Sequence, residues 1–215
     1  MTNFIPIFPL EIIIYPGEKV NLHIFEERYK QLISETHKNK KYFGIPPVIK
    51  NKIAETGTQV ELVEIVKQYE DGKMDVTVKG ASVFRVLEVI ETIPVKLYSG
   101  AIVKHLSNDF TTSKHLKAVV SAVRELHGLL NISKDFKKPE EELTSYDLAH
   151  HAGLSLDEEY DLLNLLREDQ RIEYLRRHLK KIIPVVASAE ALKKKIQLNG
   201  HFKELKGFDF DPGKK

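Results

Sequence analysis

A chain of 215 residues, of which 42% are hydrophobic and 30% charged, has an ordinary globular composition and is long enough for one large domain or a core domain with an appended one. Its 33 basic and 31 acidic residues give a net charge of only +2, so the chain has no general attraction to polyanions. Without cysteine it has no disulfide, thiolate metal site or thiol nucleophile, and without a basic leader or a membrane-length apolar run we expect it in the cytoplasm, away from membranes.

The opening of the chain predicts extended structure followed by a helix. The prolines in Pro6 to Leu10 are incompatible with a helix, and the β-branched run Ile12 to Tyr15 is typical of a buried strand. Pro16 and Gly17 suit the two central positions of a turn. The next predicted elements are an extended run over Val20 to Phe25 and a helix from Glu26 to about Thr36.

The order of these residues resembles the start of the N-terminal, substrate-binding domain of the Lon proteases. That family opens approximately with phenylalanine-proline-leucine, a hydrophobic strand, proline-glycine, leucine-histidine-isoleucine-phenylalanine-glutamate and then arginine-tyrosine. Glu27 departs from the pattern, because the family commonly has proline at this point. The resemblance implies structural roles for the matching residues, which are Phe8, Pro9, Leu10, Pro16, Gly17, His23, Phe25, Glu26, Arg28 and Tyr29.

A second β-rich region follows the first helix. Asp71 and Gly72 form a strong two-residue hairpin signal, and Gly80 is expected to turn the chain between two strands. Many short strands around one early helix predict a strongly curved, partly closed β-barrel over residues 1–107, and the Lon resemblance implies its PUA-like form. The predicted strands are Tyr42 to Ile49, Thr58 to Lys67, Met74 to Lys79, Val83 to Ile90 and Pro94 to His105.

Helical spacing of apolar residues replaces the strand pattern after this region. The fold class is therefore α+β, with a helical bundle over residues 108–199 and a tail over residues 200–215. Thr144 with Asp147 and Ser155 with Glu158 have the spacing of helix-capping boxes, and Pro184 is expected to end or kink a helix. The predicted helices cover Leu116 to Leu130, begin at Thr144, Ser155 and Asp169, and close with Ser188 to about Leu198.

No motif in the chain indicates an enzyme. A phosphate-binding loop needs a glycine-rich turn followed by lysine and serine or threonine, which is absent, and the serine–lysine peptidase segment of the Lon proteases is missing as well. We therefore expect no catalytic residue, no cofactor, and neither ATPase nor protease activity. His23, Glu26 and Glu27 could face one another, but a metal site needs further ligands, so local packing is the preferred interpretation.

The Lon resemblance implies a non-enzymatic module that recognises proteins, because substrate selection is the role of this domain in the family. The candidate polypeptide-binding residues are Tyr42, Phe43 and Tyr69, from segments expected to lie close together on a small barrel. Aromatic side chains left at the rim would form an apolar patch for an unfolded or flexible segment. Such a module could act as an adaptor, a regulator or a holdase, with a protease or a chaperone as its partner.

The alternative function is RNA binding, because some PUA-like domains bind RNA. Acidic residues interspersed among the bases of the helical half favour a solvated helix face, and the chain lacks tryptophan and a glycine-aromatic RNA-binding signature. Nucleic acid is therefore the less favoured partner. The basic residues concerned are Arg167, Arg171, Arg176, Arg177, Lys180 and Lys181.

Overall fold

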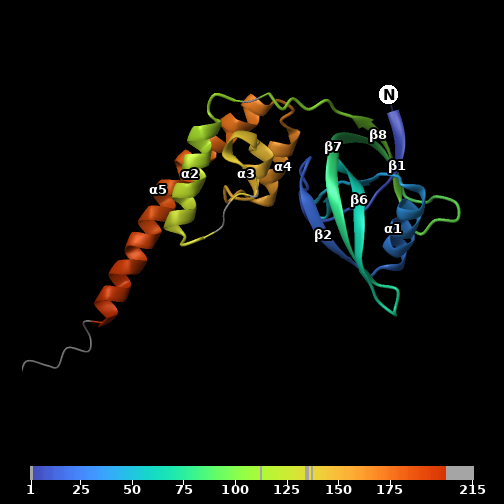
Figure 1. Cartoon of the computed structure of the whole chain (residues 1–215), viewed down its shortest axis with the longest axis horizontal. Coiled ribbons are helices and arrows are strands. Elements are labelled where there is room, and N and C mark those ends of the chain that lie inside the picture. Colours follow the sequence, from blue (N-terminus) through green and yellow to red (C-terminus); the bar gives the residue numbers. More distant parts are fainter. Residues whose placement is uncertain (1, 112, 134–135, 137, 202–215) are drawn as a thin grey trace, which may run out of the picture.

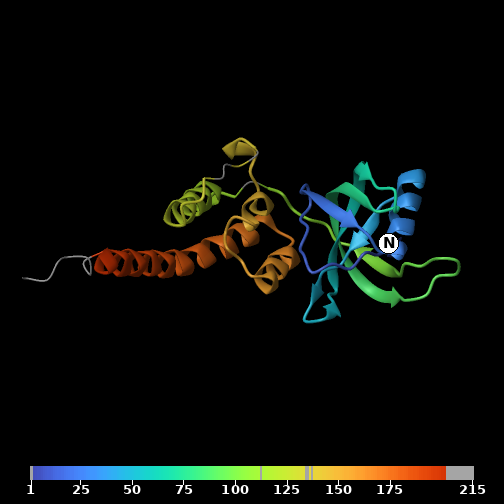
Figure 2. The same cartoon turned by 90° about the horizontal axis from the view of Figure 1, so that it is seen from below.

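The computed structural model describes residues 2–111, 113–133, 136 and 138–201. A curved antiparallel sheet with one helix forms one end of the molecule, and the remaining helices form the other end (Figures 1 and 2). The predicted α+β class is confirmed, whereas the PUA-like form of the sheet stays a prediction. No helix in the described part of the chain combines the length and apolar character needed to cross a membrane.

The main sheet has the strand order β1-β8-β7-β6-β3, and its two end strands do not pair with each other. The chain after β1 contacts β3 through isolated bridges, Ile7 to Gly44 and Leu10 to Pro47. β2 pairs with the first part of β7, and β8 pairs with the second part. The strands are β1 (Thr2–Pro6), β2 (Lys19–Ile24), β3 (Phe43–Ile45), β6 (Thr56–Gln68), β7 (Met74–Ile90) and β8 (Gly100–His105), with a separate ribbon of β4 (Val48–Ile49) and β5 (Lys52–Ile53).

Helix α1 (Glu27–Asn39) packs Tyr29, Leu32 and Ile33 into the core of this half and lies on the side away from the other helices (Figure 1). Its amphipathic spacing explains the burial, since residues three and four apart share one face of a helix. The helix therefore covers the sheet near its open edge. Its last turn and the residues after it lie beside β1 and β3.

The segment Ile12 to Tyr15 is buried as predicted except for the partly buried Ile12, but it forms no strand. The Thr58 hydroxyl donates a hydrogen bond to the Ile14 carbonyl, and the Tyr15 amide donates to the Glu18 carboxylate at 2.9 Å. Side chains thus satisfy backbone groups that a neighbouring strand would otherwise bind. The strand prediction was wrong because an apolar run reports burial and not its hydrogen-bond partners.

The turn predicted at Pro16 and Gly17 is confirmed, since the Glu18 amide donates to the Tyr15 carbonyl at 3.1 Å and Gly17 has φ +87°. Gly80, in contrast, is not a turn: β7 runs through it without a break. The Gly17 amide donates to the Gly80 carbonyl at 2.8 Å, and the Gly80 amide donates to the Glu18 carbonyl at 2.9 Å. Glycine is needed there because the turn packs directly on the strand.

The hairpin between β6 and β7 is confirmed, but its loop is longer than the predicted two-residue turn. The Tyr69 amide donates to the Lys73 carbonyl at 2.9 Å, and the Gly72 amide donates to the Tyr69 carbonyl at 3.0 Å. Gly72 adopts φ +78°. This arrangement is a turn closed by a left-handed residue, the common form of three-residue hairpin loops.

The helical half contains α2 (Leu116–Leu129), a short 3-10 turn at Glu140–Glu142, α3 (Ser145–Ala149), α4 (Leu156–Asn164) and α5 (Glu168–His201). Both predicted capping boxes, Thr144 with Asp147 and Ser155 with Glu158, are confirmed at the starts of α3 and α4. Apolar side chains from all four α-helices form one core, which the sheet half joins through Ile13, Tyr15 and Val83.

Helix α5 continues through Pro184, so the predicted separate helix from Ser188 does not exist. Ile183 and Val186 pack against the helical core on either side of the proline, and this contact holds the helix together despite the missing amide. Asp169, the predicted cap, lies in the first turn instead. Of the predicted tail, residues 202–215 lie outside the described residues.

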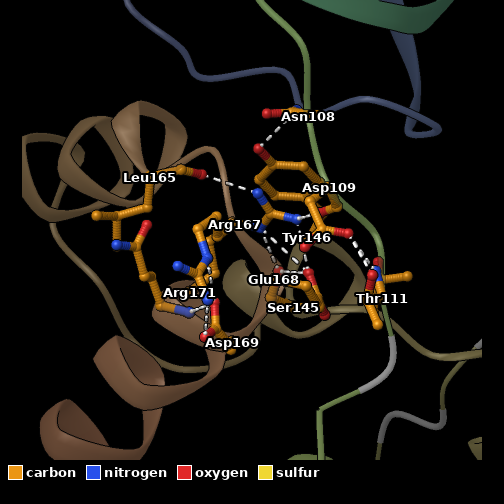
Figure 3. A network of polar contacts seen from close by, with 12 residues as sticks. Asn108, Asp109, Thr111, Ser145, Tyr146, Leu165, Arg167, Glu168, Asp169 and Arg171 are labelled. Carbon is orange, nitrogen blue, oxygen red and sulfur yellow. Dashed lines mark hydrogen bonds and ion pairs between the residues drawn. The ribbon is translucent and has the colours of Figure 1, made fainter.

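Arg171 is fully buried where α3, α5 and the segment after β8 meet (Figure 3). Its guanidinium forms an ion pair with Glu168 at 2.7 Å and donates to the carbonyls of Leu165 at 2.8 Å and Asp109 at 2.7 Å. The Ser145 hydroxyl also accepts from it at 2.8 Å, and its carbon atom lies 4.3 Å from the centre of the Tyr146 ring. A buried charge is tolerated only when it is paired and hydrogen-bonded in this way.

His150 connects the two halves of the molecule. Its Nδ1 lies 2.6 Å from Glu159 of α4, and its Nε2 lies 3.1 Å from Glu18 of the turn before β2. Burial would lower the pKa of His150, but the hydrogen bonds and charges of Glu159 and Glu18 outweigh it and raise that pKa to about 10. The Tyr15 ring packs on the imidazole, with centroids 5.0 Å apart.

The stability that His150 contributes is therefore expected to depend on pH. A group whose pKa is higher in the folded state than in the unfolded state contributes fully below its unfolded value of 6.5 and loses the contribution as pH rises through about 10. Because the side chain is 37% exposed, solvent screening limits the effect to roughly 1–2 kcal/mol. Urea titrations at a series of pH values should show the difference between wild type and His150→Gln shrinking from pH 6.5 to 10; a constant difference would contradict this.

Candidate polypeptide-binding groove

A groove lies where the sheet fails to close, between β1 and β3 and beside the end of α1. Its larger part has a volume of about 660 Å³ and is lined by residues of β1, by the end of α1 and by Tyr42, which precedes β3. A smaller hollow of about 330 Å³ continues from it toward β6. The two parts share Thr36, Lys40, Lys41 and Tyr42, so we treat them as one groove.

Two aromatic side chains are exposed in this groove. Phe4 of β1 is 49% exposed and Tyr42 is 45% exposed, although large aromatic side chains are usually buried. Phe43, which follows Tyr42, is fully buried, because successive side chains of an extended segment point to opposite sides. Phe43 therefore belongs to the core, and the structure removes it from the candidate contact residues.

One wall of the groove is held in place by polar contacts between α1 and the loop before β8. A single oxygen of Glu35 accepts hydrogen bonds from Lys96 and from the Tyr98 hydroxyl, each at 2.7 Å. The hydrogen bond from Lys96, followed by that from Tyr98, lowers the pKa of the Glu35 carboxyl, and burial together with Glu35 raises the pKa of Tyr98. Gln31 fixes the same loop by accepting from the Leu97 amide at 2.8 Å.

Tyr69 lies on a different surface, at the hairpin between β6 and β7. β3 pairs with β6 at Val60, whereas Tyr69 follows the far end of β6, on the order of 25 Å away along the strand. The Tyr69 hydroxyl donates to Asp75 at 2.7 Å, and His23 contacts the other oxygen of Asp75 at 2.6 Å. The predicted residues Tyr42 and Tyr69 therefore do not share one patch.

The residues of the Lon-like opening divide into buried and exposed groups. Phe8 and Tyr29 are buried and stack with ring centroids 3.8 Å apart, and Arg28 lies over the outer face of Tyr29. His23 and Phe25 are exposed, so core packing does not account for them. The others are Pro9, Leu10 and Pro16, which are partly buried, Gly17, which is exposed in its turn, and Glu26, which accepts from Arg28 at 2.8 Å.

The basic residues of α5 do not form one free cationic face. Arg171 is buried, and Arg176 and Arg177 each pair with Glu173 at 2.7 Å. Hydrogen bonds from Arg176 and Arg177 lower the pKa of Glu173 to about 2, so its carboxylate stays charged and keeps both arginines paired at neutral pH. Lys180 and Lys181 are exposed, and Arg167 pairs with Asp169.

The sequence did not reveal the polar side of the groove. Lys40 and Lys41 belong to a short basic stretch that contains no recognisable motif, and the contact of Glu35 with Lys96 joins residues far apart in the chain. The buried position of Arg171 had one weak signal, its place next to Ile172 and four residues before Leu175 on the apolar side of the helix. Among the described residues no group of three or more metal-ligating side chains comes together.

Comparison with known proteins gives a consistent result. Residues 5–181 match the family described as the ATP-dependent protease La (LON) substrate-binding domain. A Lon N-terminal domain protein from Xanthomonas campestris has a similar structure, with a TM-score of 0.61 and 22% identity, over 81% of this chain and 98% of that one. The N-terminal domain of the Mycobacterium avium complex Lon protease has a TM-score of 0.60 and 14% identity, over 83% of this chain and 98% of that one. No curated protein matches the chain.

Proposed function

The chain belongs to the Lon substrate-binding domain family, and from this premise we propose that it holds unfolded or flexible polypeptide segments in the groove between β1 and β3. The observation that carries this proposal is the pair of exposed aromatic side chains, Phe4 and Tyr42, on the side of the sheet where its end strands β1 and β3 do not pair. The module would act as an adaptor, a regulator or a holdase, with a protease or a chaperone as a partner. The absence of catalytic activity and the cytoplasmic location stay predictions.

The groove offers an extended polypeptide two kinds of contact. Exposed rings can bury apolar side chains of the segment, at about 25 cal/mol for each Å² removed from water. The side of β1 that does not pair with β8 also carries backbone groups that can pair with an added strand, a common way to recognise a peptide without regard to its sequence. Both contacts suit a module that recognises unfolded segments of many proteins.

RNA binding through α5 is the weaker alternative. A continuous set of free arginines would be needed to neutralise phosphates, but Arg171 is buried and Arg176 and Arg177 are engaged by Glu173. No feature of the described residues favours this function over polypeptide binding. The RNA proposal would require Lys180 and Lys181 to supply most of the charge.

Truncating the exposed aromatic of the groove is expected to weaken polypeptide binding. Tyr42→Ala removes a ring worth roughly 1–2 kcal/mol of apolar burial, so affinity for a permanently unfolded model protein should fall on the order of tenfold. Fluorescence anisotropy with a labelled, reduced and alkylated protein measures this directly. Binding of the unfolded protein should also survive moderate salt, because apolar burial is not screened.

Phe25→Ala is the matched control, because Phe25 is also an exposed aromatic (58%) but lies on β2's side of the sheet and outside the groove lining. It should bind the unfolded protein like wild type. If Phe25→Ala weakens binding and Tyr42→Ala does not, the groove is not the site. Loss of binding in the double variant Arg176→Ala, Arg177→Ala, or an affinity that decreases steeply with salt, would instead favour the basic face of α5 as the binding site.

A further inference from the structure

We infer that the groove selects acidic segments, in which an aromatic or large aliphatic side chain is flanked by aspartate or glutamate. This inference rests on the proposed function and adds the chemical class of its substrate. The occupant is an extended polypeptide, since the groove follows the open edge of the sheet between β1 and β3. Its charge follows from the residues around the two exposed rings.

Lys40 and Lys41 are the two side chains that give the groove its charge. Both line the larger part and the smaller hollow, and both are exposed. Neither forms an ion pair with any residue that the structure describes. Two ammonium groups without carboxylate partners beside exposed rings are complementary to an anionic, apolar ligand.

In the larger part of the groove, no carboxylate cancels this charge. Glu35 accepts hydrogen bonds from Lys96 and Tyr98 on the wall, and the charges of Glu35 and Lys96 compensate each other. Glu61 lines only the smaller hollow. The larger part, where Phe4 lies, therefore contains Lys40 and Lys41 with no unpaired carboxylate in its described lining.

The end of α1 fixes the position of both lysines. Lys40 adopts the left-handed conformation with φ +49°, its amide donates to the His37 carbonyl at 3.4 Å, and the Lys41 amide donates to the Thr36 carbonyl at 3.2 Å. Glycine or asparagine would suit this conformation better than lysine. Basic residues also stabilise the negative end of a helix, but that effect does not require both side chains to line the groove.

The test uses three labelled peptides with the same phenylalanine and leucine centre, flanked by aspartate, serine or lysine. Fluorescence anisotropy at about 50 mM salt should rank them aspartate, serine, lysine, with about tenfold between the first two, as two exposed ion pairs allow. The preference should shrink to about threefold or less at roughly 0.5 M salt, where exposed charges are screened. Equal affinities for the aspartate and serine peptides at low salt would overturn the inference.

The double variant Lys40→Gln with Lys41→Gln assigns the preference to these residues. It should bind the serine peptide like wild type and lose the preference for aspartate. The matched control is Lys114→Gln with Lys117→Gln, which removes two exposed lysines near the start of α2, outside the groove lining, and should keep the preference. A preference that survives in the groove variant contradicts the inference.

Tyr42→Ala separates this inference from the proposed function. If Tyr42→Ala lowers the affinity for all three peptides while wild type shows no charge preference, the groove is the binding site but does not select acidic segments. If it leaves all three peptides unaffected, the groove is not the binding site and both proposals fail.

Discussion

Replacing Arg171 with alanine is expected to destabilise the protein by about 3–5 kcal/mol, the usual cost of removing one partner of a buried ion pair. The variant leaves Glu168, which is 3% exposed, as a buried carboxylate without its cation. It also removes the donors to the carbonyls of Leu165 and Asp109 and the cation that faces Tyr146. A loss of this size is a large part of the total stability of a typical domain, about 5–15 kcal/mol.

Urea denaturation followed by circular dichroism measures this change, with Arg176→Ala as the control. Arg176 is on the same helix, but it is exposed and Glu173 keeps its second partner, Arg177, so the expected cost is small compared with that of Arg171→Ala. Replacing both partners, Arg171→Met with Glu168→Leu, should cost less than Arg171→Ala, because no charge is left unpaired. Equal effects of Arg171→Ala and Arg176→Ala would show that the network does not stabilise the fold.

Gly80→Ala is expected to have the second largest effect, a destabilisation of about 1–3 kcal/mol or more from overpacking. A Cβ atom at this position would lie 2.1 Å from the Tyr15 carbonyl oxygen, a backbone atom that cannot rotate away. The turn at Pro16 and Gly17 would have to separate from β7 and lose its two hydrogen bonds to Gly80. The displacement would reach Tyr15, which packs on Tyr146 and so connects the sheet to the helices.

Gly128→Ala provides the control for this glycine. Gly128 lies inside α2, and no atom lies within 4 Å of the position that its Cβ would take. Alanine has the higher helix propensity, so the variant should be more stable than wild type by roughly 0.5–1 kcal/mol. The two glycine variants should therefore shift the urea midpoint in opposite directions. A midpoint for Gly80→Ala at or above that of wild type would contradict the close packing of the turn on β7.

Local signals in the sequence predicted the elements that depend on local chemistry. The capping boxes at Thr144 and Ser155, the turn at Pro16 and the hairpin at Gly72 all form, because each is decided by residues three or four apart. The opening of the chain resembled the Lon substrate-binding domains, and the family match covers residues 5–181. The α+β class followed from the change of apolar spacing between the two halves.

The failures concern contacts between distant parts of the chain. Gly80 suggested a turn, but glycine is required there because a backbone segment more than sixty residues earlier packs against it. No local pattern encodes such a contact. Arg171 was counted with a solvated face because its partners Ser145 and Asp109 lie on other segments. The predicted two-residue loop of the β6–β7 hairpin was also too short, since the length of the loop depends on how the strands pair.

The candidate site could be predicted only in part for the same reason. The sequence did not indicate which of the aromatic residues are exposed: Tyr42 is exposed, whereas alternation along the chain puts its neighbour Phe43 in the core. Tyr69 was grouped with them because the order of strands around the sheet was unknown, and the long β6 separates it from the groove. Whether Tyr69 contacts a polypeptide on its own surface stays a prediction.

The most direct test of the central claim, that the groove between β1 and β3 binds polypeptide, is to map the bound segment on the protein by nuclear magnetic resonance. The protein is labelled with ¹⁵N and titrated with an unlabelled unfolded polypeptide. The groove proposal predicts that amide shift changes cluster at residues 3–5, 36–42 and 59–63, most of which line it. Changes confined to the surface of His23, Phe25 and Tyr69, or to the basic residues of α5, would contradict the account.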